Sequence, residues 1–248
     1  GRQRAGVGGA MDSARLKPGA LAGFIELHIE QGPILERRNV AIGIVEKIAA
    51  PSALRLRLTG VGGHAGAVLM PERRDALLAG AEIALAVEQA ALNSGSPDTV
   101  GTTGVFRIEP GAVNSVPSSV LLEIDLRDTD LACRDAALGK IETAAGEICR
   151  RRGIELQLER LNVDAPAICD PILVQTLARI CEELNFSSAK LISRAYHDTL
   201  FMAGICPSAM IFIPCRGGVS HRPDEYSAPE QIERGVRVLA EMLRVLAI

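Results

Sequence analysis

The chain has 248 residues, a formal net charge of −3 and 48% hydrophobic residues. A chain of this length can bury one large hydrophobic core or two smaller ones. Its near-neutral charge and the lack of a long basic run exclude a typical nucleic-acid-binding surface. No stretch reaches the roughly 18 consecutive apolar residues that a membrane span needs. We therefore expect neither nucleic acid nor a membrane among its partners.

The cysteines and the N-terminal residues say little about compartment. Six cysteines are scattered without C-x-x-C spacing, a pattern typical of small buried hydrophobic residues rather than of a disulfide scaffold or a zinc knuckle. Residues 1–18 are rich in Gly and Arg and lack the apolar core of a secretory signal. They also lack an initiator Met, so we expect the natural chain to begin further upstream.

The first predicted element is a strand with a polar face. Residues 24–30 (FIELHIE) alternate between apolar and polar side chains, and His28 lies on the polar face between two glutamates. Gln31-Gly32-Pro33 ends this strand. A second strand is expected over residues 42–48, and Pro51 is expected to break the chain.

Residues 50–162 predict a separate domain. The elements expected there are a strand at 54–58, a helix at 74–92, strands at 99–108 and 120–127, a helix at 130–152 and a strand at 154–158. This β-α-β-β-α-β order predicts a ferredoxin-like sandwich. It would be inserted into a discontinuous α/β domain formed by residues 1–49 and 163–248. That domain should include a helix opened by Asp170-Pro171, a buried strand at 209–213 and a helix opened by a Ser227/Glu230 capping box.

The chain has only four histidines, and each lies beside glycines, carboxylates or a turn. An imidazole beside carboxylates, as at His28, is a common metal-ligand arrangement, although a solvated strand edge explains it as well. His221 follows the predicted strand 209–213, where open α/β sheets bind ligands, but a plain surface turn would look the same. His64 lies in a glycine-rich loop that lacks the Lys and Ser/Thr of a phosphate-binding P-loop.

Four motifs in this order resemble the carbamoylase/allantoate amidohydrolase branch of the dinuclear metallopeptidase superfamily. They are HIEQGP at 28–33, GHAG at 63–66, PGAVNSVP at 110–117 and SHRPDE at 220–225. The resemblance runs from about residue 21 to the C-terminus. Within the branch, residues 191–203 and 211–215 are most similar to members that act on ureidoglycolate. Relatives acting on other ureides more often show GAGHDA where this chain has RAYHDT.

The resemblance implies metal-dependent hydrolysis of the ureido C–N bond of ureidoglycolate, giving glyoxylate, ammonia and carbon dioxide. It implies two divalent metal ions, one bound by His28 and the other by His221. Imidazole and carboxylate ligands suit manganese and zinc equally, and the family favours manganese. The compartment would be the endoplasmic reticulum for a plant-type enzyme and the cytoplasm otherwise.

The resemblance also implies a homodimer formed through the inserted domain, which acts as a lid over a small ureido-acid substrate. His64 of the partner subunit would stabilise the oxyanion formed at the attacked carbonyl. Asn114 and Arg127, also from the partner's lid, would hold the substrate carboxylate, and Gln31 and His197 would line the pocket. Tyr196 would fill space and offer a hydroxyl to a small hydroxy-bearing substrate, although packing against the core explains it as well.

Two alternatives stay open. Within the class, the substrate could be allantoate or an N-carbamoyl-L-amino acid. In another class, the chain could be a non-catalytic dimerisation module, because the family's remaining His, Asp and Glu ligands and its general base lie upstream of the HIEQGP motif. Residues 1–25 contain no His and a single Asp, Asp12. We therefore expect either a piece of a longer protein or a chain without catalytic competence.

Overall fold

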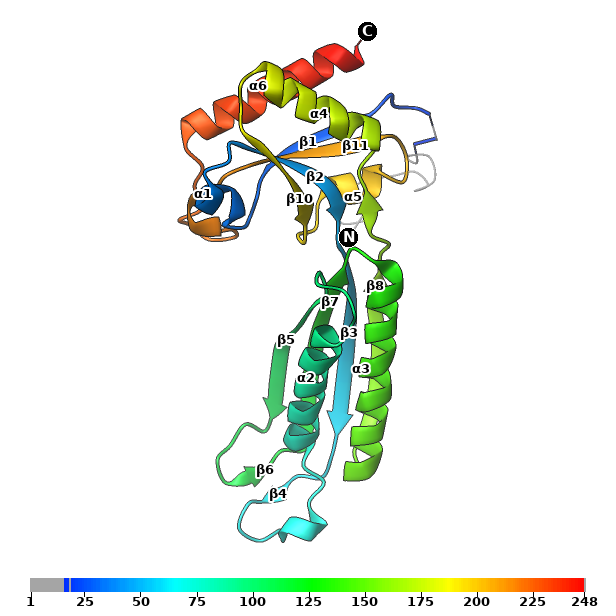
Figure 1. Cartoon of the computed structure of the whole chain (residues 1–248). Coiled ribbons are helices and arrows are strands. Elements are labelled where there is room, and N and C mark those ends of the chain that lie inside the picture. The colour runs from blue at the N-terminus through cyan, green and yellow to red at the C-terminus, as the bar shows by residue number, and fades with distance from the viewer. Residues whose placement is uncertain (1–15, 18, 248) are drawn as a thin grey trace, which may run out of the picture. The chain divides into compact units, whose positions relative to one another are not determined.

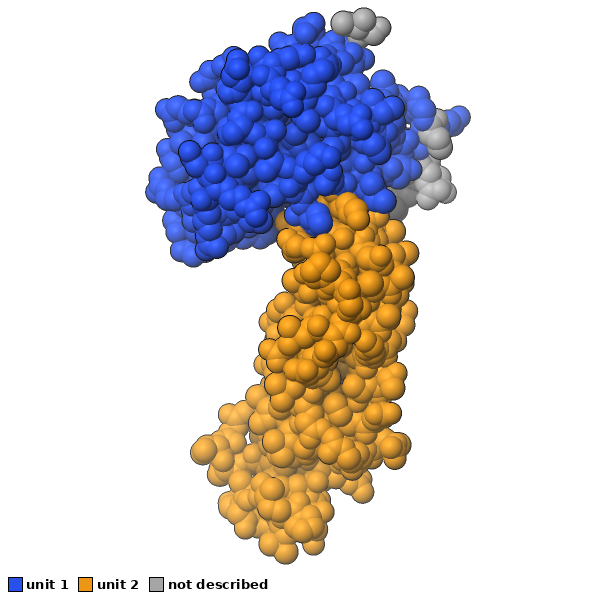
Figure 2. All heavy atoms as spheres, viewed as in Figure 1, with its two compact units in different colours: residues 1–46, 167–193, 197–248 blue, residues 47–166, 194–196 orange. Residues whose placement is uncertain are grey.

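The computed structural model describes residues 16–17 and 19–247, which form two compact units. Unit 1 comprises Gly1–Glu46, Ala167–Ser193 and His197–Ile248, and unit 2 comprises Lys47–Pro166 and Arg194–Tyr196 (Figure 2). Unit 2 extends beyond the expected insertion at both ends, and its short second segment was not expected. The expectations about a leader and about Asp12 fall on residues outside those described.

Unit 1 is built on a mixed sheet with the strand order β1-β11-β2-β10, to which β9 adds beside β2. Its strands are β1 (Phe24–Ile29), β2 (Ile42–Ile48), β9 (Ala167–Ile168), β10 (Ser188–Ser193) and β11 (Ser208–Ile213). Its helices are α1 (Ile34–Arg38), α4 (Pro171–Glu183), α5 (Asp198–Met202), the 3-10 turn η4 (Arg216–Gly218) and α6 (Pro229–Leu246). Helices α4 and α6 pack on each other and on β11 (Figure 1). Every residue of β11 is buried, as expected for a strand inside a sheet that is covered on its faces.

The two long helices of unit 1 begin differently, and only α4 has a side-chain N-cap. Asp170 accepts hydrogen bonds from the backbone N–H groups of Ile172 and Leu173, as its position before Pro171 predicts. The expected Ser227/Glu230 capping box is wrong. Helix α6 begins at Pro229, and the Gln231 side chain accepts the Ala228 N–H at 2.8 Å. Ser227 instead donates to the Pro214 carbonyl at 2.8 Å, which fastens the end of the loop that follows β11.

Unit 2 contains a four-stranded antiparallel sheet with the strand order β5-β7-β3-β8. Its strands are β3 (Ala50–Thr59), β5 (Val100–Glu109), β7 (Ser119–Asp128) and β8 (Glu155–Val163), and its helices are α2 (Ala76–Leu92) and α3 (Leu131–Arg152). A two-stranded ribbon of β4 (Gly63–His64) and β6 (Ser115–Val116) and the 3-10 turn η3 (Met70–Glu72) complete it. The predicted α/β fold class is confirmed.

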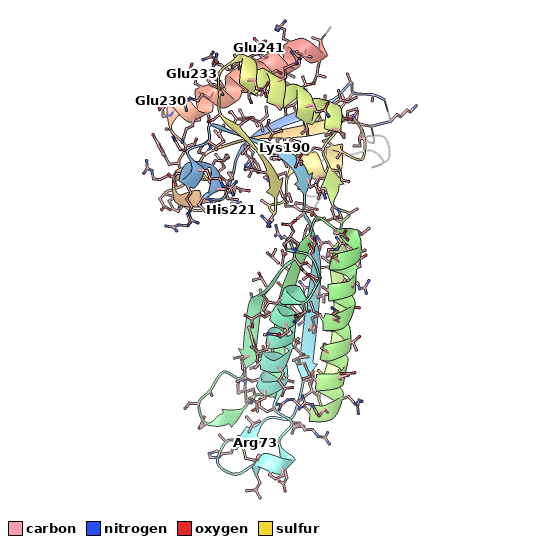
Figure 3. The ribbon with its side chains drawn as sticks, in the orientation of Figure 1. Arg73, Lys190, His221, Glu230, Glu233 and Glu241 are labelled. Carbon is pink, nitrogen blue, oxygen red and sulfur yellow. The ribbon has the colours of Figure 1, made fainter. Side chains whose placement is uncertain are left out.

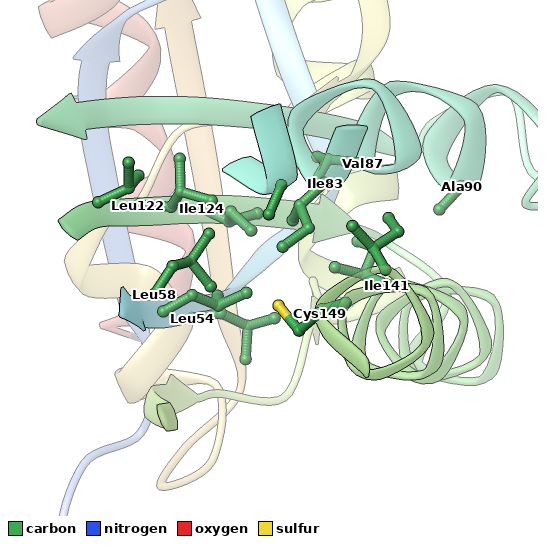
Figure 4. Packing of buried hydrophobic residues seen from close by; sticks show 14 of the residues in the cluster. Leu54, Leu58, Ile83, Val87, Ala90, Leu122, Ile124, Ile141 and Cys149 are labelled. Carbon is green, nitrogen blue, oxygen red and sulfur yellow. The ribbon is translucent and has the colours of Figure 1, made fainter. Parts of the chain in front are cut away.

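The core of unit 2 follows from strand alternation. Buried residues alternate along β7, and Leu54 and Leu56 of β3 lie opposite Ile124 and Leu122 of β7. These side chains meet the inward faces of α2 and α3, as Figure 4 shows. Helix α3 ends at Gly153, whose φ of 65° is the left-handed conformation that glycine adopts without strain.

Pro51 does not break the chain, contrary to the sequence expectation. It lies inside β3, opposite Arg127 of β7. The pairing of β3 with β8 begins only at Ser52. Because Pro51 has a strand partner on one side only, its missing N–H removes no ladder hydrogen bond from the β8 side.

All six cysteines are free; five are buried and Cys133 is half-buried. Among the described residues, no helix combines the length and the apolar character needed to cross a membrane.

Candidate functional site

Residues from two parallel strands of unit 1 reach the same edge of its sheet. Strand β1 runs parallel to β11, with His28 opposite Phe212 and Ile29 opposite Ile213. The segments that follow these strands therefore leave from the same edge, where open α/β sheets place their ligands. This topology explains how Gln31 comes close to Ser220 and His221, which lie 189 and 190 residues later in the chain.

Gln31 joins the two segments through its side-chain amide. The amide nitrogen donates to Ser220 Oγ at 2.7 Å and lies 3.4 Å from His221 Nε2. Both Gln31 (φ 57°) and His221 (φ 59°) have left-handed backbone conformations. Such conformations are uncommon for residues other than glycine and are concentrated at functional sites. The backbone N–H of His221 also donates to Glu225 Oε2 at 2.9 Å, which fixes the start of the turn.

His28 is oriented as a metal ligand would be. Its Nδ1 lies 2.8 Å from the Ile29 carbonyl oxygen. A carbonyl can only accept, so Nδ1 carries the ring hydrogen and Nε2 keeps its lone pair. Metal-binding imidazoles commonly donate their second nitrogen to a carbonyl in this way. The orienting group is therefore the backbone, not a carboxylate as the strand pattern suggested.

His197 is buried against His28. Only 5% of His197 is exposed, and the two rings lie edge to face with their centroids 4.8 Å apart. Burial, with the adjacent His28, lowers the pKa of His197 to about 4, so that ring is neutral near pH 7. Its Nε2 lies 2.8 Å from Ser193 Oγ. His197 thus supports the ring of His28, and the predicted pocket-lining role stays a prediction.

Glu26 completes a compact group of possible ligands. Ligand atoms of Glu26, His28 and His197 all lie within 4.8 Å of one another. Glu26 Oε2 accepts from both the backbone N–H (2.9 Å) and the hydroxyl (2.5 Å) of the buried Thr199. Neutral imidazoles and a carboxylate are donors that manganese and zinc accept, so this side of the site fits a divalent cation.

Glu30, the next acidic residue on this strand face, binds backbone N–H groups of the chain itself. Its two carboxylate oxygens accept the backbone N–H groups of Ile34 (2.8 Å) and Leu35 (2.7 Å) at the start of α1. A carboxylate at a helix N-terminus satisfies N–H groups that have no partner inside the helix. Glu30 therefore holds the turn after β1, while the group of possible ligands among the described residues contains Glu26, His28 and His197.

In unit 2, His64 and Asn114 lie together. His64 pairs with Ser115 in the β4–β6 ribbon, and the Asn114 carbonyl accepts the Ala65 N–H at 2.9 Å. The His64 side chain is exposed, and its Nδ1 accepts the Gly66 N–H at 3.1 Å. Both predicted residues thus come to one end of the unit 2 sheet, beyond Thr59 and Ser119 (Figure 1).

Arg127 lies at the other end of that sheet. It is the last residue but one of β7, whose ten residues span about 30 Å. Its guanidinium binds Asp125 through Nε (2.7 Å) and Nη2 (2.8 Å) and donates from Nη1 to the Arg194 carbonyl at 2.9 Å. The hydrogen bonds that Arg127 donates to Asp125 raise the pKa of Arg127. The expectation that Asn114 and Arg127 of one lid hold one carboxylate is wrong, because β7 separates them.

Tyr196 belongs to the segment that packs with unit 2. Its hydroxyl donates to Asp164 Oδ2 at 2.6 Å. Burial, together with the Asp164 carboxylate, raises the Tyr196 pKa to about 12. In this structure the phenol hydrogen is thus held by a carboxylate of the chain itself. A role for Tyr196 in substrate choice stays a prediction.

Sequence reasoning missed two residues at the site. Thr199 fixes the carboxylate of Glu26, and Ser193 contacts His197. A polar residue four positions before a histidine, at the end of a strand, was the available signal for Ser193. Nothing in the local pattern indicated Thr199, because its partner lies in a strand far away in the sequence.

Comparison with known proteins gives relatives at high identity. The chain is 51% identical over 239 residues to the ureidoglycolate hydrolase of Arabidopsis thaliana, covering 96% of this chain and 50% of the relative. It is 39% identical over 225 residues to the N-carbamoyl-L-amino-acid amidohydrolase of Pseudomonas sp. (strain NS671), covering 91% and 54%. The chain therefore spans about half the length of these relatives.

Solved structures of similar proteins point to the same relatives as the sequence comparison. The crystal structure of AtUAH in complex with glyoxylate superimposes with a TM-score of 0.89 at 52% identity, covering 94% of this chain and 56% of that one. A hydantoinase/carbamoylase family amidase from Burkholderia multivorans gives a TM-score of 0.85 at 32% identity, covering 92% and 55%. The profile of peptidase family M20/M25/M40 matches residues 2–245. The chain therefore belongs to peptidase family M20/M25/M40, whose enzymes are metal-dependent and typically hold two metal ions.

Proposed function

We propose that this chain is part of a metal-dependent amidohydrolase that cleaves the ureido C–N bond of ureidoglycolate, giving glyoxylate, ammonia and carbon dioxide. The observation that carries the proposal is the convergence of His28, Gln31 and His221 at one sheet edge. It occurs in a chain 51% identical to a ureidoglycolate hydrolase.

His28 and His221 would each hold one divalent cation, for which we propose Mn²⁺. Such ions would polarise the ureido carbonyl and lower the pKa of bound water. On the protein side, the Ile29 carbonyl keeps the lone pair of His28 on Nε2. Gln31 holds the segment that carries His221. Buried His197 fixes the position of the His28 ring.

The groups for the substrate lie in unit 2. We propose that His64 donates from Nε2 to the oxyanion that forms at the attacked carbonyl. Asn114 and Arg127 would bind the substrate carboxylate. A guanidinium has five N–H groups, and three of those in Arg127 are used by Asp125 and the Arg194 carbonyl. The remaining two can meet a carboxylate while Asp125 keeps the guanidinium plane in place.

The positions of these groups support a site that is shared by two copies of the chain. Within one unit 2, β7 separates His64 and Asn114 from Arg127 by about 30 Å. A ureido acid of a few atoms cannot span that distance. We therefore propose that one substrate takes Arg127 from one copy and His64 and Asn114 from the other.

The surface of unit 2 offers an interface for such a homodimer. Strand β5 is an edge strand of the sheet and exposes the large apolar side chains of Val100, Phe106 and Ile108. Helix α2 packs beside β5 and exposes a leucine at every seventh residue: Leu78, Leu85 and Leu92. Long apolar edge strands are normally covered. Pairing β5 with β5 of a second copy would cover this strand and the leucines together.

A second substrate class has support of its own. The Pseudomonas relative, at 39% identity, is named for N-carbamoyl-L-amino acids, and allantoate is the other alternative. We favour ureidoglycolate because Tyr196, whose hydroxyl is bound by Asp164, would leave less room for a larger ureide if it lines the substrate site.

The test uses this chain preceded by the upstream half of the Arabidopsis relative, called the hybrid enzyme below. With Mn²⁺, we expect glyoxylate and ammonia from ureidoglycolate and much slower turnover of allantoate and N-carbamoyl-L-alanine. The hybrid enzyme with His221→Ala is the control and should be inactive. Faster turnover of either alternative substrate would reassign the specificity. If the hybrid enzyme turns over none of the three while the 248-residue chain dimerises, the non-catalytic dimerisation module is favoured.

A further inference from the structure

The loop that carries His64 holds the imidazole in one tautomer. The Gly66 N–H donates to His64 Nδ1 at 3.1 Å, and the His64 carbonyl accepts the N–H groups of Ala67 and Val68. An amide N–H can only donate, so Nδ1 is unprotonated and the neutral ring carries its hydrogen on Nε2. The outward nitrogen of His64 is thereby a hydrogen-bond donor as long as the loop keeps this shape.

The side chain of Arg73 donates hydrogen bonds to backbone carbonyls of the same loop. Arg73 follows the 3-10 turn η3 and is half-buried; it is labelled in Figure 3. Its Nε donates to the Val68 carbonyl at 3.0 Å, and its Nη2 donates to the Ala65 carbonyl. These two carbonyls flank Gly66 along the chain. Within the part of the chain that the structure describes, the guanidinium has no carboxylate in ion-pair range.

The half-buried guanidinium of Arg73 is thus bonded to two carbonyls of one short loop, which its rigid fork of donors can reach at the same time. Residues 65–67 are Ala, Gly and Ala. Their side chains are too small to fix the loop by packing. The two hydrogen bonds from Arg73 therefore restrain the backbone on either side of the Gly66 N–H.

We propose that Arg73 is a positioning residue for His64. It fixes the Ala65–Val68 backbone so that the Gly66 N–H stays on Nδ1 and the Nε2 hydrogen of His64 stays directed outward. An oxyanion donor acts only when its hydrogen is held in place before the charge develops. The inference rests on the proposed function for its consequence in catalysis, while its structural half can be tested on the chain alone.

The structural half is tested by NMR on the 248-residue chain with Arg73→Ala. We expect the Gly66 amide to exchange with solvent on the order of tenfold faster, because its protecting bond opens more often. The ¹⁵N shifts of the His64 ring nitrogens should move toward those of a ring that exchanges between tautomers. Arg74→Ala is the matched control, since Arg74 is exposed and its side chain lies near Gly153 instead. Unchanged Gly66 exchange and His64 shifts in Arg73→Ala would overturn the proposal.

The catalytic half is tested by a double-mutant cycle in the hybrid enzyme. Arg73→Ala should lower kcat about tenfold or more and leave KM nearly unchanged, because His64 acts on the charge that develops in the transition state. In a His64→Ala background the same change should have little further effect. An equal loss in both backgrounds would show a general structural role and reject positioning through His64. If the hybrid enzyme hydrolyses no ureidoglycolate, the proposed function fails, while the NMR measurement still decides whether Arg73 holds the loop.

Discussion

At the scale of single residues, the side chains that share a sheet edge were predictable and their partners were not. His28 and His221 could be named because one ends a strand and the other follows a strand. The Tyr196–Asp164 and Glu26–Thr199 bonds join residues far apart in the sequence. Alternation and turn signals report which face a residue takes, and they carry no information about which distant residue will face it.

Gly218 is a residue whose importance comes from close approach of two backbones. Its φ is 69°, and an added Cβ would lie 2.7 Å from the Gly32 carbonyl carbon and from Pro33 N. We expect Gly218→Ala to destabilise unit 1 by roughly 1–3 kcal/mol, because both the left-handed backbone and the clash oppose a side chain. Urea unfolding with an unchanged m-value is the measurement.

Gly204→Ala is the control within the same unit. A Cβ at Gly204 would meet only the Phe201 carbonyl oxygen at an ordinary 3.5 Å, so its effect should stay within about 0.5 kcal/mol. The segments that carry Gln31 and His221 do not depend on this close approach if the two variants unfold at the same urea concentration.

At the scale of elements, the long segments of unit 2 and three strands of unit 1 were predictable, and the two short helices of unit 1 were not. Helices α2 and α3 show long apolar patterns with caps at Asp75 and Asp130. Helices α1 and α5 have five residues each, too few for a period of 3.6 to appear. Helix α1 forms because Glu30 caps it from the preceding strand end. A prediction from helical periodicity does not include this contact, which comes from a side chain four and five residues earlier in the chain.

The exposed leucines of α2 lead to a prediction about assembly. Leu85 is 62% exposed in the middle of the stripe formed with Leu78 and Leu92. If this stripe and β5 form the dimer interface, Leu85→Glu places a carboxylate in an apolar contact. We expect the dissociation constant of the dimer to rise at least about tenfold, because a buried charge without a partner is costly. Sedimentation velocity of the full chain over a concentration series measures it.

The control for this variant is Ile172→Glu on α4 of unit 1, where the side chain is 73% exposed. It changes the same kind of exposed apolar side chain outside the proposed interface and should leave the dimer intact. A wild-type chain that stays monomeric at high micromolar concentration would remove the basis for the interface. Equal weakening by both variants would point to a general effect of added charge.

At the scale of the whole molecule, His64 and Arg127 of one chain lie too far apart within unit 2 to contact one small substrate. His28 and His221 belong to unit 1. Within unit 2, His64 and Arg127 lie at opposite ends of the sheet. The four motifs predicted which residues belong to the site but not that His64 and Arg127 lie far apart, because a sequence motif carries no information about distances between residues. Only the register of β7 with its neighbours showed that one lid cannot supply both Asn114 and Arg127 to one substrate.

The proposal that His64 acts in the site of the partner subunit predicts complementation between two inactive variants of the hybrid enzyme. His64→Ala and His221→Ala should each abolish most activity as homodimers. After subunit exchange, about half of the dimers would be mixed, and in each mixed dimer one site would combine intact His221 from one copy with intact His64 from the other. For a dimer with twofold symmetry, recovered activity should approach about a quarter of the unmodified enzyme. If His64 serves the site of its own chain, no mixed dimer has a complete site, and mixing restores nothing.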